Sequence, residues 1–185
     1  FTLPTNVPGG KVVLTGGLDI MTGGPFRGVL TAPAGATVAN PFTTLIESMA
    51  SNGQAGSAAG SAAGAALALG RALGLPPGLD LLSFDPLAIL ADPAASAADK
   101  LQAISVQSTA LQVANIITHV SAALSAVPGF SFAESSRCVI AALAGRLASG
   151  AATDLTSLTL ISGVYQDSVS SVLASVTGQP AGPLS

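Results

Sequence analysis

Hydrophobic positions divide the chain into two parts that meet near residue 40. Before that point, short apolar runs alternate with glycine, proline and threonine, which is typical of strands joined by turns. Residues 11–15 and 26–32 predict the two strands of a hairpin, and the glycine-flanked segment 16–24 predicts the loop between them. After residue 40, apolar side chains recur at spacings of three and four, which indicates amphipathic helices.

Two Asx-Pro steps mark expected helix starts in the second part. Asn40-Pro41 places an N-cap residue before a proline at the first helical position, where the missing N–H costs nothing. Asp92-Pro93 repeats this arrangement and predicts the start of a long third helix. Between a second helix and this third one, residues 78–91 predict an irregular segment anchored by leucines.

Later signals place two more helices. Ser131 and Glu134 have the spacing of a capping box, and Thr153 or Asp154 is the expected N-cap of the last helix. We therefore expect five helices, over residues 41–51, 55–73 and 93–126, then from about 132 to 150 and from about 155 to 177.

These patterns predict a mainly α fold, in which an N-terminal β-hairpin or small sheet precedes a bundle of about five helices. The expected organisation is a hairpin segment over 1–39, a helical bundle over 40–178 and an extended tail over 179–185. The sequence leaves open whether the strands complete a sheet of their own chain or of a neighbour. Because the chain begins at Phe1, we also expect flanking domains of a larger precursor.

The amino-acid composition excludes several classes of protein. Six Lys and Arg residues cannot build the basic field that a nucleic-acid binder needs, and one cysteine cannot build a disulfide framework. The longest Ala/Leu run, residues 61–75, contains Arg71 and is too short to span a membrane. Tryptophan is absent and aromatic residues make up 4%, so the core must be aliphatic.

Charged residues make up only 8% of the chain, and the net charge is −3. A monomer of this mass exposes roughly 8,000 Å², which leaves about one charge per 500 Å², far below a usual soluble surface. Two interpretations stay open. In the first, serine and threonine hydroxyls solvate the surface; in the second, another copy or the rest of a larger protein covers much of it.

Three glycines four residues apart, Gly56, Gly60 and Gly64, would share one face of the predicted second helix. Each interior glycine costs a helix roughly 1 kcal/mol relative to alanine, so the repeat suggests a compensating close contact. That contact is packing against the third or fifth helix, an interface between subunits, or a seat for a flat ligand.

His119 is the only histidine and lies within the third predicted helix. It is a candidate haem or metal ligand, although no second ligating side chain stands three or four residues away; a helical surface or core position is the competing interpretation. Cys138, in the fourth predicted helix, is interpreted as a small buried hydrophobic residue rather than a nucleophile, and its reactivity stays open.

Aspartates in two loops are candidate calcium ligands, because calcium prefers clustered oxygens on flexible segments. Asp19 lies in the hairpin loop, and Asp80 and Asp85 lie in the irregular segment. The competing interpretation is backbone capping, which the proline after Asp85 favours. EF-hand spacing and glycine-rich nonapeptide repeats are both absent from the sequence.

Signatures of catalysis are missing from the sequence. It contains no Gly-x-Ser-x-Gly elbow, phosphate-binding loop, His-Glu-x-x-His motif or Rossmann glycine pattern. We therefore expect a protein that is not an enzyme and that carries no cofactor.

Residues 17–46 carry a series of short motifs. Gly16-Gly-Leu-Asp19 is followed by Thr22-Gly23, by a Phe-x-Gly-x-Leu-x-Ala-Pro-x-Gly run over 26–35, and by Pro-Phe-Thr-Thr-Leu over 41–45. The series resembles a segment of large bacterial secreted or surface proteins with cadherin-like, Ig-like or calcium-binding repeats. Phe42 departs from the leucine that is commoner there. The resemblance implies a secreted, modular and non-enzymatic context, and it supplies no catalytic residues.

The sequence thus predicts an extracellular or cell-surface structural module, adhesin-like and bacterial, that self-associates as a homo-oligomer or polymer into a filament, layer or matrix. Exchange or addition of edge strands is the expected contact, besides the glycine face. The strand residues expected at this interface are Val12, Val13, Leu14, Val29 and Leu30. The alternative function is a binding domain for an apolar small ligand such as a lipid, a carotenoid or a haem.

Overall fold

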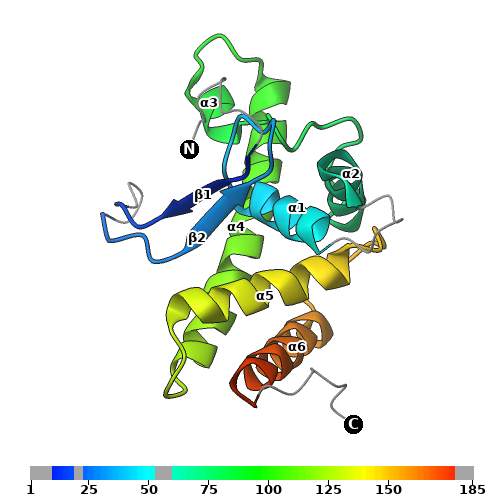
Figure 1. Cartoon of the computed structure of the whole chain (residues 1–185). Helices are drawn as coiled ribbons and strands as arrows, with labels where there is room; N and C mark the ends of the chain where they lie inside the picture. Colours follow the sequence, from blue (N-terminus) through cyan, green and yellow to red (C-terminus); the bar gives the residue numbers. More distant parts are fainter. Residues whose placement is uncertain (1–9, 19–22, 53–59, 178–185) are drawn as a thin grey trace.

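The computed structural model describes residues 10–18, 23–52 and 60–177 of the chain (Figure 1). The fold is mainly helical, with a two-stranded antiparallel sheet near the N-terminus. The elements are β1 (Val12–Thr15), β2 (Val29–Ala32), α1 (Pro41–Ser51), α2 (Ala62–Ala72), α3 (Pro86–Ala91), α4 (Ala97–Ser125), α5 (Phe132–Leu147) and α6 (Leu158–Thr177). The predicted fold class is therefore confirmed.

Helix α5 lies at the centre of the helical part. It contacts α1 and α4 on one side and α6 on another, while α2 packs against α1 (Figure 1). Side chains from five helices meet there and exclude solvent; the largest are Leu45, Ile46, Leu69, Val106, Val113, Val139, Leu143, Leu147 and Val164. The core is mainly aliphatic, as predicted, but it also contains the aromatic ring of Phe42.

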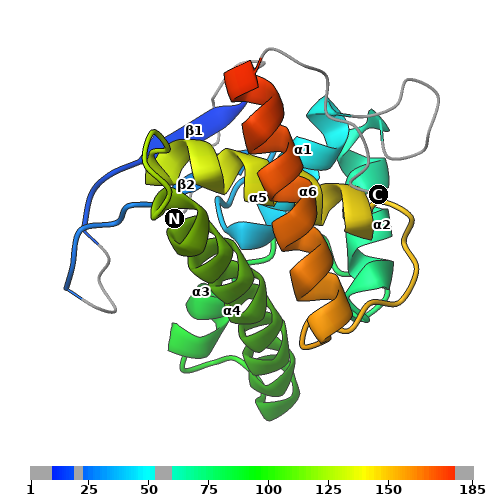
Figure 2. The same cartoon turned by 90° about the horizontal axis from the view of Figure 1, so that it is seen from below.

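The first half of α4 extends past α5 and α6, accompanied by the short helix α3 (Figure 2). Helix α3 corrects the prediction of an irregular segment over 78–91. Asp85 is its N-cap and Pro86 its first residue, so the Asx-Pro arrangement that starts α1 also operates here. The described residues thus contain one short helix more than the five predicted.

Three predicted helix starts were wrong, those of α2, α4 and α6. Helix α4 begins at Ala97 after the N-cap Ser96, because Asp92 instead ends α3 and accepts a hydrogen bond from the Ala94 N–H at 2.8 Å. Ser96 and Asp99 have the Ser-x-x-Asp spacing that should have indicated this start. Helix α6 begins at Leu158, since Asp154 closes a turn with Thr156 before the helix.

The starts of α1 and α5 are as the sequence predicts. Asn40 and Thr43 form a reciprocal capping box at α1, and Ser131 and Glu134 form one at α5. In each box, two backbone N–H groups that lack helical partners receive side-chain acceptors, which fixes the helix start locally.

Candidate functional site

The hairpin is fastened to the helices by hydroxyl groups. The Thr31 N–H in β2 donates to Thr44 Oγ1 at 2.9 Å, and the Thr31 carbonyl accepts from Thr43 Oγ1 at 2.9 Å. Thr43 and Thr44 lie in the first turn of α1, and both are buried. The N-terminal turn of α1 therefore occupies the hydrogen-bonding positions that a third strand would take beside β2.

The register of the sheet then determines which groups of β1 face outward. Val13 pairs with Thr31, and Leu14 pairs with Leu30. Because both backbone groups of Thr31 point away from β1, this is a non-hydrogen-bonded pair, and both backbone groups of Val13 point away from β2. Among the described residues, no backbone hydrogen bond from outside the sheet reaches Val13 or Thr15. The outer edge of β1 is therefore open in the described part of the chain.

Side chains of the hairpin divide in the same alternating way. Val12 and Leu14 face inward and pack with Ala32, Ala36 and Ala39 in a small apolar cluster of their own. Val13 lies on the opposite face and is 52% exposed. Of the predicted interface residues in β1, Val12 and Leu14 pack within the chain, and Val13 is presented to solvent.

The remaining two predicted strand residues, Val29 and Leu30, are half-buried. Both line a small cavity of about 60 Å³ between β2 and the middle of α4. Lys11, beside β1, lies 3.9 Å from the Glu47 carboxylate of α1, so its charge is directed toward the helices. The outer edge of β1 thus carries no ion pair among the described residues.

Helix α4 has an apolar outer face near its N-terminal end. Leu101, Ile104 and Leu111 lie on one side of the helix and are 68%, 52% and 53% exposed. Their spacing of three and seven residues resembles the seam of a helix that pairs with another helix. Nothing in the described residues covers this face.

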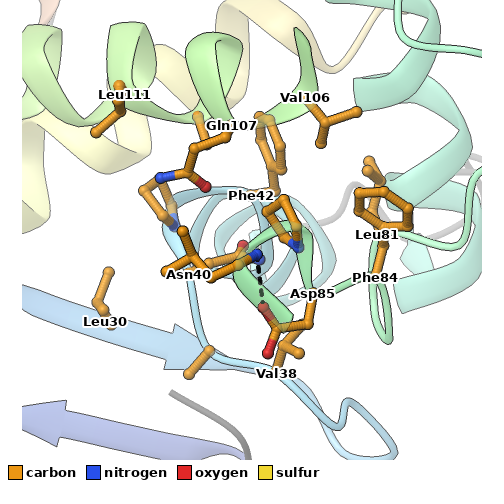
Figure 3. Close-up of a pocket in the computed structure, with 15 residues that line it drawn as sticks. Leu30, Val38, Asn40, Phe42, Leu81, Phe84, Asp85, Val106, Gln107 and Leu111 are labelled. Atoms are coloured by element: carbon orange, nitrogen blue, oxygen red, sulfur yellow. Dashed lines mark hydrogen bonds between the residues drawn. The ribbon is translucent and has the colours of Figure 1, made fainter. Parts of the chain in front are cut away.

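A cavity of about 180 Å³ lies between the helices and the hairpin (Figure 3). Four separate segments line it: β2, residues 38–42 at the start of α1, residues 81–87 at the start of α3, and α4. Most of the wall is apolar, and Asn40, Asp85 and Gln107 supply the polar groups. The Asp85 carboxylate accepts from the N–H groups of Leu87 and Ala88 at 3.0 Å, which is its capping role in α3.

His119 lies on the exposed side of α4, beside a shallow groove between α4 and α6. Leu158, Ile161 and Tyr165 form much of the other wall. Within the described ranges, no group of three or more His, Cys, Asp or Glu side chains could hold a metal ion. The prediction of a haem at His119 stays a prediction.

Cys138 is half-buried in α5. Burial raises the pKa of its thiol, and the neighbouring Glu134 carboxylate raises it further. A raised pKa lowers the thiolate fraction at neutral pH, and the thiolate is the nucleophile. These surroundings fit the interpretation of Cys138 as a packing residue.

The candidate calcium ligands are not gathered together in the described part of the chain. Asp80 accepts from the Leu82 N–H at 3.0 Å and from the Ser83 hydroxyl at 2.5 Å, and Asp85 caps α3. Asp19 lies outside the described residues. Local capping accounts for both described carboxylates, and calcium binding stays a prediction.

The glycine face predicted on the second helix is only partly described. Gly56 lies outside the described residues, and Gly60 precedes Ser61, whose hydroxyl accepts from the Gly64 N–H at 3.1 Å as the N-cap of α2. Helix α2 therefore starts at Ala62 rather than near residue 55, and Gly64 alone of the three is shown within it. The role of these glycines in an interface stays a prediction.

No helix among the described residues is long and apolar enough to cross a membrane. Comparison with protein-family models, with curated proteins and with solved structures finds no match to this chain. The site therefore has to be interpreted from its own geometry.

Proposed function

We propose that this chain is a non-enzymatic structural module of a secreted or cell-surface bacterial protein, and that it associates with further copies through the outer edge of β1. The observation that carries the proposal is the outward orientation of the Val13 backbone groups opposite Thr31. An open strand edge is a template for another strand, and proteins usually protect such edges.

A second copy of β1 fits this edge in an antiparallel arrangement. With a two-fold axis at Leu14, Val13 of one copy faces Thr15 of the other. Both residues direct their backbone groups outward, so the two pairs supply about four hydrogen bonds. The strand is only four residues long, so pairing through it alone is weak and should depend strongly on concentration.

Charge supports association with a copy of the same chain. The accessible surface of 10160 Å² carries about one charged side chain per 700 Å², so two copies meet with little repulsion. A two-fold strand contact gives a closed dimer. Growth into a filament or layer needs a second surface, and the apolar outer face of α4 (Leu101, Ile104 and Leu111) is the surface we assign to it.

The test is Val13→Pro, measured by light scattering at protein concentrations up to about 1 mM, where contacts of about 4 kcal/mol are detected. Proline removes the outward N–H and leaves the β1–β2 hydrogen bonds in place, as prolines on natural edge strands do. We expect the wild type to exceed the monomer mass, and the variant, which keeps only the α4 face, to have a lower mean mass than the wild type at each concentration.

Val13→Ala is the matched control, because it shortens the same side chain and keeps the N–H. It should associate nearly as the wild type does. A wild type that remains a monomer over the whole concentration range contradicts the proposal, and so does a Val13→Pro variant that associates normally.

A further inference from the structure

The cavity of about 180 Å³ between the hairpin and α4 has neither Val13 nor Thr15 of the strand edge in its wall. We infer that it binds a compact, uncharged aromatic molecule with one hydrogen-bonding substituent, of the phenol class. The inference rests on the volume, the wall and the single polar group that reaches in from α4.

Volume sets the size of the ligand. Apolar cavities of about 150 Å³ in proteins take up benzene and stay dry without it, whereas drug-sized ligands need roughly 300–1,000 Å³. The space here therefore accommodates a single six-membered ring with a small substituent. It is too small for a haem or a carotenoid.

The wall is suited to an aromatic ring. Phe42 and Phe84 present ring faces or edges from α1 and from the segment before α3, and Leu81, Val106 and Ala110 complete an apolar surface. Phe42, Leu81, Val106 and Ala110 are buried, so the wall belongs to the folded core. Aromatic pairs in such settings gain from offset or edge-to-face contact beyond the apolar area they bury.

Gln107 supplies the polar contact. Its side chain extends from α4 toward Phe42 and Asn40 (Figure 3). No hydrogen bond of this side chain to other described residues is present, so its amide can donate to or accept from a ligand hydroxyl. A phenol that pairs with Gln107 replaces water there, and benzene cannot.

Charge determines which ligands are excluded. Asp85 is part of the same wall, as are the half-exposed Leu87 and Leu111. An anionic ligand such as benzoate would be placed near the Asp85 carboxylate in an apolar setting, where like charges repel strongly. The site should therefore discriminate phenol from benzoate although the two are similar in size.

The experiment titrates the wild-type protein with phenol, benzene and benzoate and follows the methyl resonances of leucine and valine by NMR. We expect saturable shifts with phenol at Val106 and Leu81, no shift at Leu143, weaker binding of benzene and no binding of benzoate. The binding should saturate in the millimolar range, as expected for an occupant of about seven heavy atoms.

Two variants identify the site. Gln107→Leu should lower the affinity for phenol about fivefold and leave that for benzene unchanged or higher, since one neutral hydrogen bond is lost. Ala110→Leu should fill the cavity and abolish binding of both. Ala122→Leu, the same change at an exposed position of α4, is the matched control and should bind as the wild type does.

Three results would overturn the inference: no saturable shift of the wild type with phenol, equal binding by the Ala110→Leu variant, or an unchanged phenol-to-benzene ratio in Gln107→Leu. If Ala110→Leu does not fold, the ratio of the phenol and benzene affinities in Gln107→Leu is the test of the inference. Gln107 is half-buried, so its replacement leaves the core intact. Because Leu111 belongs both to the cavity wall and to the outer face of α4, the titrations are run at a protein concentration where light scattering shows monomer.

Discussion

The helical body and the hairpin of this chain are held by different interactions. In the body, Leu143, Val113 and Val164 come from three helices and exclude solvent completely. The hairpin has only a small cluster of its own, and its link to the body runs largely through the hydroxyls of Thr43 and Thr44. Burial of apolar area is not directional, whereas a hydrogen bond is. The helical body is therefore stabilised mainly by buried apolar area, and the hairpin is aligned by the hydroxyl groups of Thr43 and Thr44.

The largest expected effect comes from a cavity in the helical body. Leu143→Ala removes a fully buried side chain of α5, where α1, α4 and α6 meet. We expect a loss of about 3 kcal/mol in the free energy of unfolding, from lost transfer energy and the cavity that remains. Urea denaturation followed by circular dichroism measures it.

Leu67→Ala, at a 63% exposed site of α2, is the matched control and should change stability by less than about 0.5 kcal/mol. A loss of equal size in both variants would contradict the assignment of the core. The hairpin should unfold together with the body in Leu143→Ala, since it has nothing else to pack on.

Removing one hydroxyl should separate the hairpin from the body. Thr44→Val keeps the shape of the side chain and leaves the Thr31 N–H without its acceptor, at an expected cost of about 1–2 kcal/mol. Hydrogen exchange should then accelerate at the amides of Thr31 and Leu14, while the amide of Leu143 exchanges as before. Thr118→Val, at an exposed position of α4, is the control.

Uniform acceleration of exchange throughout Thr44→Val would show instead that the hairpin and the body form one cooperative unit. In that case the hydroxyls contribute to global stability rather than to alignment of the strand edge.

Local signals in the sequence account for much of the body. The start of α1 at Pro41 and the capping box at Ser131 follow from residues within one turn, so they could be predicted. The start of α4 was misplaced because Asp92-Pro93 has the same form as the helix start at Asn40-Pro41, whereas in the structure Asp92 follows α3 and Ser96 caps α4.

The candidate sites depend on contacts between distant segments. Whether Val13 or Leu14 directs its backbone outward depends on Thr31 and on α1, since the alternating pattern of β1 fits either register. The cavity near Gln107 combines four segments spread over residues 30–111, and no motif along the chain indicates it. Sequence reasoning therefore missed the cavity and could expect the open edge only as one of two alternatives.

Substitution of two helical glycines by alanine tests how helix propensity and side-chain packing together determine stability. An alanine Cβ at Gly145 in α5 would meet nothing within 4 Å, so Gly145→Ala should stabilise the protein by about 1 kcal/mol. At Gly163 in α6 the same Cβ would meet the guanidinium of Arg146, which donates to Asp167 at 2.8 Å.

Gly163→Ala should therefore stabilise less than Gly145→Ala, because displacing Arg146 sacrifices a half-exposed ion pair worth about 0–1 kcal/mol. Paired urea denaturation curves of the two variants measure the difference. Adding Asp167→Asn to both backgrounds should make the two alanine substitutions more nearly equal; an undiminished gap would mean that the Arg146–Asp167 pair is not its cause.

The smallest expected effect concerns the pH dependence of the α5 start. The Ser131 hydroxyl and N–H donate to Glu134 Oε2 at 2.6 and 3.0 Å, and these bonds hold the pKa of Glu134 below its usual 4.5. A folded-state pKa below the unfolded one stabilises the fold above the unfolded pKa, and this contribution is lost as the pH falls through the folded pKa.

Ser131→Ala removes the hydroxyl bond and keeps the backbone one, so the pKa of Glu134 should rise toward its usual value. The free energy of unfolding should then decrease less steeply as the pH is lowered through the acid range. Carbon-detected NMR titration of the side-chain carboxyl measures the shift, and Asp154, whose pKa is lowered in the same way by Thr156, is an internal reference that should not move. An unchanged pKa of Glu134 would mean that the Ser131 N–H, and not the Ser131 hydroxyl, is the donor that lowers it.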